Sequence, residues 1–241
     1  MNYPHSRSHS STPTATPKRS HTVRVAAAAS LAAILSLAGC AVPELVGGMA
    51  QSAYLEGSTT FPAEYTGLEG ETWAVVTLAD RGITSEVFNI QTILTNATTG
   101  KLVAAQMGGK LGSDGYVPGP EVLVLQTGEP TFDSWTFGKM AEELGVSRLV
   151  VIDIASFRLH EPGNRYLWDG RVAARVGVVE ADLRPDEFAY VKDFNIAYPD
   201  DSGRTQQDFS RGHVVNVLLD RLSDRAAWLF FEHDEPNVIK Y

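Results

Sequence analysis

The sequence predicts an α/β (α+β) fold, with a single mixed β-sheet of about five strands packed by about three helices. An apolar run rich in β-branched residues, 73–78, is bounded by charge and glycine and indicates a buried strand. Three segments between 148 and 197 suit an antiparallel meander. A long apolar stripe at helical spacing follows and predicts a C-terminal helix. Together these patterns define one domain over 73–233.

The first half of this domain is expected to alternate between strand and helix. Thr84, Ser85 and Glu86 suit the start of a helix, and apolar residues recur at helical spacing up to Ala97. Gly100 is a natural stop, and 102–105 is expected to form a short strand.

The middle of the domain holds a glycine-rich stretch and two further helices. Residues 107–116 resemble a phosphate-binding loop only loosely, because Leu111 stands where a Ser or Thr should follow the lysine; a surface loop is favoured. Residues 120–126 suit two helical turns opened by Pro120. Asp133 and Ser134 are expected to cap the next helix, which Gly145 ends.

The second half is expected to contain the meander and the long helix. Strands are predicted over 148–159, 171–178 and 188–197, and their alternation indicates that one face packs on the core. The helix is predicted from Thr205 or Asp208 to Glu232, with a tail over 234–241.

The N-terminal segment has the pattern of a secretory signal. Residues 1–24 carry only positive charges and are followed by an apolar run, 25–38. As a helix this run would span roughly 21 Å, whereas a permanent membrane span needs roughly 30 Å. We therefore expect a signal peptide over 1–39 rather than a retained transmembrane helix.

The end of that run, Leu37-Ala38-Gly39-Cys40, resembles the lipobox of bacterial lipoproteins. The resemblance implies cleavage before Cys40, a diacylglyceryl group on its thiol and acylation of the new amino group, which together anchor a protein stably. Residues 40–72 would then be the lipidated N-terminus and a flexible tether. No Asp follows Cys40, which favours a periplasm-facing position at the outer rather than the inner membrane. The alternative is an ordinary cleavage site near a buried free cysteine.

Composition excludes several classes of partner. Loss of 1–39 would remove four basic and no acidic residues, which takes the formal net charge from −9 to −13. Such a charge argues against binding to nucleic acid or to anionic lipid. Cys40 is the only cysteine, so the sequence predicts no internal disulfide and no thiolate metal site.

The stretch Met140-Ala141-Glu142-Glu143-Leu144-Gly145-Val146-Ser147-Arg148-Leu149-Val150-Val151 carries a second resemblance. With the predicted order of elements, it is similar to the small α/β module of CsgG-like curli-assembly lipoproteins, of the TolB amino-terminal domain and of penicillin-binding-protein activator lipoproteins. The resemblance covers about 73–232. It implies a module that binds proteins or assembles envelope machines and is not catalytic.

The side chains that could carry chemistry form no evident local site. His160, His213 and His233 make no local pair of metal ligands. Glu142 and Glu143 are adjacent and do not share a helix face. Asp153, inside a predicted strand, is expected to face the polar side of the sheet or to pair with an arginine.

The sequence thus predicts lipidation of Cys40 and no catalytic, cofactor-binding or metal-binding residue. We expect a lipid-anchored interaction or assembly module of the cell envelope, attached to the membrane by lipid, with an envelope protein as partner. The alternative is a lipid-anchored hydrolase acting on envelope polymer, whose acids converge only through folding.

Overall fold

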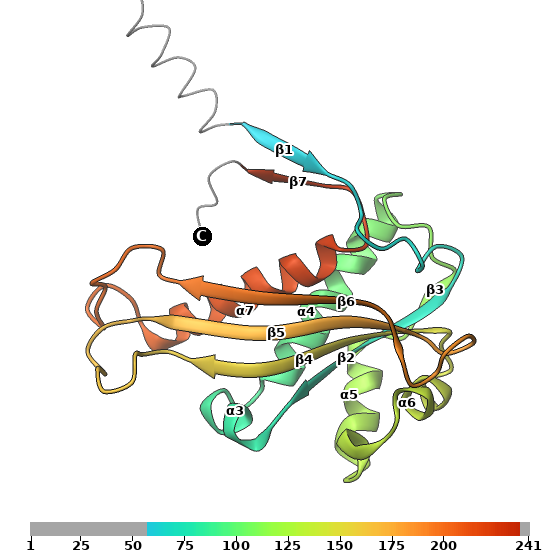
Figure 1. The fold of residues 1–241 in the computed structure, drawn as a ribbon, viewed down its shortest axis with the longest axis horizontal. Helices are drawn as coiled ribbons and strands as arrows, with labels where there is room; N and C mark the ends of the chain where they lie inside the picture. Colours follow the sequence, from blue (N-terminus) through green and yellow to red (C-terminus); the bar gives the residue numbers. More distant parts are fainter. Residues whose placement is uncertain (1–56, 237–241) are drawn as a thin grey trace, which may run out of the picture. The chain divides into compact units, whose positions relative to one another are not determined.

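A computed structural model describes residues 57–236 of the chain (Figure 1). Its main element is a five-stranded mixed sheet in the order β3-β2-β4-β5-β6. β2 runs parallel to β3 and β4, whereas β4, β5 and β6 are antiparallel. The predicted fold class and meander are confirmed. The strands are β2 (Thr72–Ala79), β3 (Gly115–Tyr116), β4 (Arg148–Arg158), β5 (Gly170–Glu180) and β6 (Phe188–Tyr198).

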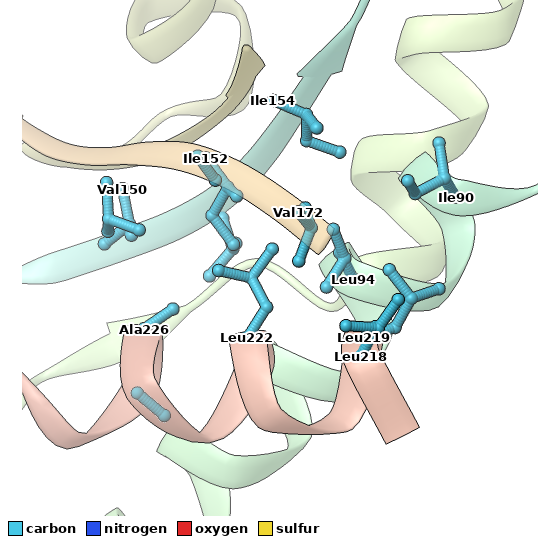
Figure 2. Close-up of a cluster of buried hydrophobic side chains, with 14 of the residues drawn as sticks. Ile90, Leu94, Val150, Ile152, Ile154, Val172, Leu218, Leu219, Leu222 and Ala226 are labelled. Carbon is cyan, nitrogen blue, oxygen red and sulfur yellow. The ribbon is translucent and has the colours of Figure 1, made fainter. Parts of the chain in front are cut away.

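One face of this sheet is covered by three helices, which are α3 (Arg81–Glu86), α4 (Ile90–Met107) and α7 (Arg211–Trp228). Apolar side chains of α4 and α7 meet those of β4 and β5 there and form the larger core cluster. Figure 2 shows this contact with Ile90, Leu94, Val150, Ile152, Ile154, Val172, Leu218, Leu219, Leu222 and Ala226 labelled.

The opposite face is covered only in part. A smaller cluster joins β2 and β4 to α5 (Gly119–Gly128), the short 3-10 turn η1 (Phe132–Ser134) and α6 (Phe137–Leu144). Its buried members are Ala74, Val76, Val122, Phe132, Met140, Ala141, Val146, Leu149, Val151 and Val179. β2 and the first half of β4 are therefore buried on both faces, which explains their near-continuous apolar sequences.

The region after β2 differs from the sequence prediction. Asp80, not Thr84, caps the first helix, and α4 begins after Asn89 and continues through Gly100 to Met107. The predicted strand over 102–105 is wrong. Leu94, Thr98, Leu102 and Ala105 are all buried and keep the helical spacing across the glycine. That burial outweighs the cost of roughly 1 kcal/mol for a glycine inside a helix.

Other helix boundaries also shift. α6 is capped by Thr136, whose side chain accepts from the backbone N–H of Lys139, so the predicted cap at Asp133 and Ser134 is wrong. Gly145 ends α6 as predicted and has a φ of 66°. α7 is capped by Ser210 and ends at Trp228, so it is shorter at both ends than the predicted helix.

A second, two-stranded sheet joins β1 (Ser58–Phe61) to β7 (His233–Pro236). The sequence places β1 within the tether and β7 at the domain end and tail. The His233 ring stacks on Trp228 at 4.8 Å and on Phe61 at 5.9 Å between ring centroids. These contacts fix the pair to the end of α7. A four-residue strand that pairs with a distant segment leaves no periodic signal in the sequence.

Candidate interaction surface

The far half of the meander carries a sheet face that no described element covers. α6 reaches β6 only near its start, where Phe137 contacts Phe188 with ring centroids 4.9 Å apart. Beyond that point the side chains turned away from α4 and α7 are exposed or half-exposed. We call this set the outer face: Asp153, Arg171, Ala173, Arg175, Asp193, Asn195 and Ala197.

A row of alternating charge crosses the outer face. The strand register places Asp153 of β4 opposite Arg175 of β5, and Arg175 opposite Asp193 of β6. The Nε of Arg175 donates to Asp193 at 2.9 Å, and this hydrogen bond raises the pKa of Arg175. Asp153 thus faces the polar side of the sheet, as predicted. The row holds one positive and two negative groups.

A second cluster of charged side chains lies at the far end of the outer face. Asp169 accepts from Arg158 at 2.8 Å and from Arg171 at 3.0 Å. Beside it lies a groove of about 380 Å³, which adjoins a hollow of about 470 Å³. Arg171 and Ala197 line both. The small side chains of Ser156, Ala173 and Ala197 line part of the groove, beside the longer Arg158 and Arg171.

The inner side of β6 is tied to the segment before β2. Glu64 accepts from Tyr190 Oη at 2.7 Å and from Lys192 Nζ at 2.9 Å. The hydrogen bond from Lys192, followed by that from Tyr190, lowers the pKa of Glu64. Burial, followed by the hydrogen bond to Glu64, raises the pKa of Tyr190. The Lys192 side chain is therefore held on the inner side of the sheet, which α4 and α7 cover, and away from the edge of β6.

The three histidines have separate surroundings. His160 stacks on Trp168 at 4.5 Å between ring centroids, and His213 Nε2 lies 2.9 Å from the Tyr198 hydroxyl. His233 is buried between Phe61 and Trp228. Within 57–236, no group of three His, Cys, Asp or Glu side chains is arranged to hold a metal ion. Cys40 lies outside the described residues.

A wide hollow of about 900 Å³ lies beside α6 and contains three acidic side chains. Asp182 is hydrogen-bonded to Arg148, and Asp186 accepts from the backbone N–H of Gly138 at 3.1 Å. Glu142 is exposed on α6, as is Glu143. Two of the three carboxylates are thus held by separate structural contacts, and they do not point toward a common reacting atom.

Sequence reasoning missed Asp193 as part of the outer face, Arg158 at the end of that face, and Glu64 on the inner side of β6. The alternation of β5 indicated that Arg171 and Arg175 share a face. The pairing of these arginines with acids on other strands depends on the register between strands, which a single sequence does not reveal.

The fold and this surface define a class of protein only coarsely: an α+β domain with a mixed sheet that is left partly uncovered. None of the helices in the described part of the chain combines the length and apolar character needed to cross a bilayer. No family model matches the chain, and no curated protein matches it.

Several solved structures resemble this chain at low identity. Lipoprotein GNA1162 from Neisseria meningitidis is 14% identical, with 64% of this chain and 97% of that chain covered and a TM-score of 0.39. A PelC dodecamer from Paraburkholderia phytofirmans is 12% identical, with 72% and 98% covered and a TM-score of 0.41. Hypothetical protein CT253 from Chlamydia trachomatis is 14% identical, with 67% and 98% covered and a TM-score of 0.36. These values support no assignment of family or activity.

Proposed function

We propose that this chain is a lipid-anchored protein of the bacterial cell envelope whose domain binds another envelope protein through the outer face. The observation that carries the proposal is the uncovered far half of the meander. Antiparallel strands can leave one polar face open to solvent, and such an open face is accessible to a partner protein. Here the described elements cover β2, the first half of β4 and the ends of β5 and β6 nearest α6, and they leave the far half of the meander open.

The chemistry of the outer face favours binding over catalysis. The carboxylates of Asp169 and Asp193 are paired with arginines, and Asp153 lies opposite Arg175 in the strand register. Small side chains at 173 and 197 leave the backbone approachable. A surface of paired charges around small residues resembles the polar part of a protein–protein interface, where such groups set specificity and register.

The location part of the proposal rests on the lipobox. Lipidated Cys40 would hold the protein at the membrane, with the outer membrane favoured and the domain facing the periplasm. A mature chain with a formal net charge of −13 would not bind anionic lipid through its own charges, so the lipid is the expected attachment.

The docking part is tested by photo-crosslinking in cells of the source bacterium. The full-length chain carries a photoreactive benzoylphenylalanine in place of Ala173, in the middle of the outer face. A matched chain carries it in place of Glu143, which is exposed on α6. We expect one reproducible protein partner from position 173 and none from position 143. The proposal fails if position 173 yields no partner, or the same products as position 143.

A further inference from the structure

We propose that the free edge of β6 accepts an extended segment of another polypeptide, which adds a sixth strand to the sheet and places a Lys or Arg opposite Asp193. The free edge is the side of β6 turned away from β5, from Val191 to Asn195. This inference rests on the proposed function, because it names how the partner would bind beside the outer face.

The backbone of β6 is open on this side. β6 is the last strand of the sheet and spans eleven residues. Arg221 Nη1 donates to the Ala197 carbonyl at 2.6 Å, which indicates that this carbonyl faces away from β5. Alternation along the strand then turns the backbone groups of Val191, Asp193 and Asn195 the same way, whereas Ala189 lies at a bulge where the register with β5 shifts. Within the described residues, no other main-chain group pairs with them.

The usual protections of an edge strand are weak here. Natural edges are blocked by proline, by short length, by a β-bulge or by a charged side chain that projects into the path of a new strand. β6 has a bulge near its start, at Ala189, and its register with β5 is regular from Val191 to Asn195. β6 contains no proline, and its central charged side chain, Lys192, is held by Glu64 at 2.9 Å on the inner side. Val191 keeps 42% of its surface exposed. An extended peptide therefore meets open backbone groups and an exposed apolar side chain.

The charge row of the outer face specifies one residue of the partner. From β4 to β6 the row is Asp153, Arg175 and Asp193, so the next strand would continue the alternation with a positive charge. Opposite charges that face each other across neighbouring strands stabilise the pairing. The Asp193 side chain is 63% exposed and can accept from a second cation while it remains bonded to Arg175.

A second copy of this chain suits the edge less well. Antiparallel pairing of two β6 strands centred on Lys192 would place Lys192 opposite Lys192, and pairing centred on Asp193 would place Asp193 opposite Asp193. Pairing centred on Val191 would place Asp193 opposite Ala189, at the bulge and without a cation. Like charges directly opposite each other destabilise a strand pair. The favoured occupant is therefore a different polypeptide with a basic residue in an extended segment.

The test places benzoylphenylalanine at position 191 or at position 195 of the full-length chain in cells of the source bacterium. Crosslinked peptides are then mapped by mass spectrometry. Strand addition predicts that both positions react with one segment of one partner, at sites about four residues apart with a Lys or Arg between them. Reaction with unrelated segments, reaction with a second copy of this chain, or no reaction would overturn the proposal.

A charge variant provides a matched comparison. Asp193→Asn should lower the crosslinking yield from position 191 by about two- to fivefold, in proportion to one cross-strand ion pair. Glu143→Gln removes an exposed acid from α6, outside the outer face, and should leave that yield unchanged. Equal yields from the two variants would contradict the assigned partner residue.

A backbone variant separates strand addition from simple proximity. Asn195→Pro removes the outward N–H and should abolish the crosslink from position 191, whereas Asn195→Ala should retain it. Unchanged thermal unfolding of both variants shows that the domain is intact, and a crosslink that survives the proline overturns the inference. If position 173 still captures a partner when the edge positions do not, the proposed function stands and only this inference fails.

Discussion

Arg221 and Asp200 join the end of the meander to α7 through a buried guanidinium. Arg221 is 9% exposed and donates to both carboxylate oxygens of Asp200, at 2.7 and 2.6 Å. This hydrogen bonding lowers the pKa of Asp200. A carboxyl group with a lower pKa in the folded than in the unfolded state contributes stability above the unfolded pKa. That contribution is lost as the pH falls through the folded pKa.

Asp200→Asn is therefore expected to lower the free energy of unfolding at pH 7 by about 1 kcal/mol, a modest value because the carboxylate is largely exposed. The difference from the unchanged chain should shrink as the pH falls below about 4. Urea unfolding at pH 7 and pH 3 measures both. Asp201→Asn, which affects an exposed pair with Arg204, should change stability by less than about 0.5 kcal/mol. A deficit that stays constant down to pH 3 would contradict the assigned cause.

Single residues differ in how far their positions follow from the sequence. Its place inside a predicted strand was sufficient to predict that Asp153 faces the polar side of the sheet. The burial of Arg148 was not predictable in this way, because its guanidinium is bound by groups from other segments. Arg148 donates to Glu71 at 2.9 Å and to the Gly67 carbonyl at 3.0 Å. Only the folded chain brings those partners to the start of β4.

At the scale of elements, one glycine ends a helix and another lies in the interior of a helix. Gly145 has a φ of 66° and ends α6, as its position after the apolar stripe predicts. Gly100 lies inside α4, and a Cβ added there would meet nothing within 4 Å. Local pattern could not separate the two cases, because the burial of Leu102 and Ala105 against the sheet decides that α4 continues.

Gly100→Ala is expected to stabilise the protein by about 0.4–1 kcal/mol, since alanine costs less backbone entropy in a helix and meets no obstruction. The melting temperature should rise by about 1–4 °C for a domain of this size. Gly145→Ala is the matched comparison and should lower it, because alanine is strained at positive φ. Thermal unfolding followed by circular dichroism tests both. A lower melting temperature for Gly100→Ala would contradict the placement of Gly100 inside α4 and would indicate that the helix ends at that residue.

For the whole molecule, the fold class followed from the sequence because β2 and β4 to β6 each carry a strong local pattern. The order of strands did not, since β2 sits between β3 and β4 through parallel pairing with segments far along the chain. The outer face could not be predicted from the sequence either. It exists because α5, η1 and α6 cover only β2, the first half of β4 and the adjoining ends of β5 and β6, and that extent depends on how the second layer packs.

The attachment of the whole protein to the membrane depends, in our proposal, on one thiol. Cys40→Ala should abolish the incorporation of labelled fatty acid and remove the protein from the outer-membrane fraction of a density gradient. The mature chain is too acidic to be retained by anionic lipid through charge. Ala41→Ser leaves Leu37 to Cys40 intact and should behave like the unchanged chain. Because an uncleaved signal segment can itself stay with the inner membrane, the fatty-acid label is the decisive measurement. Label that persists in Cys40→Ala would show that the lipid is attached elsewhere.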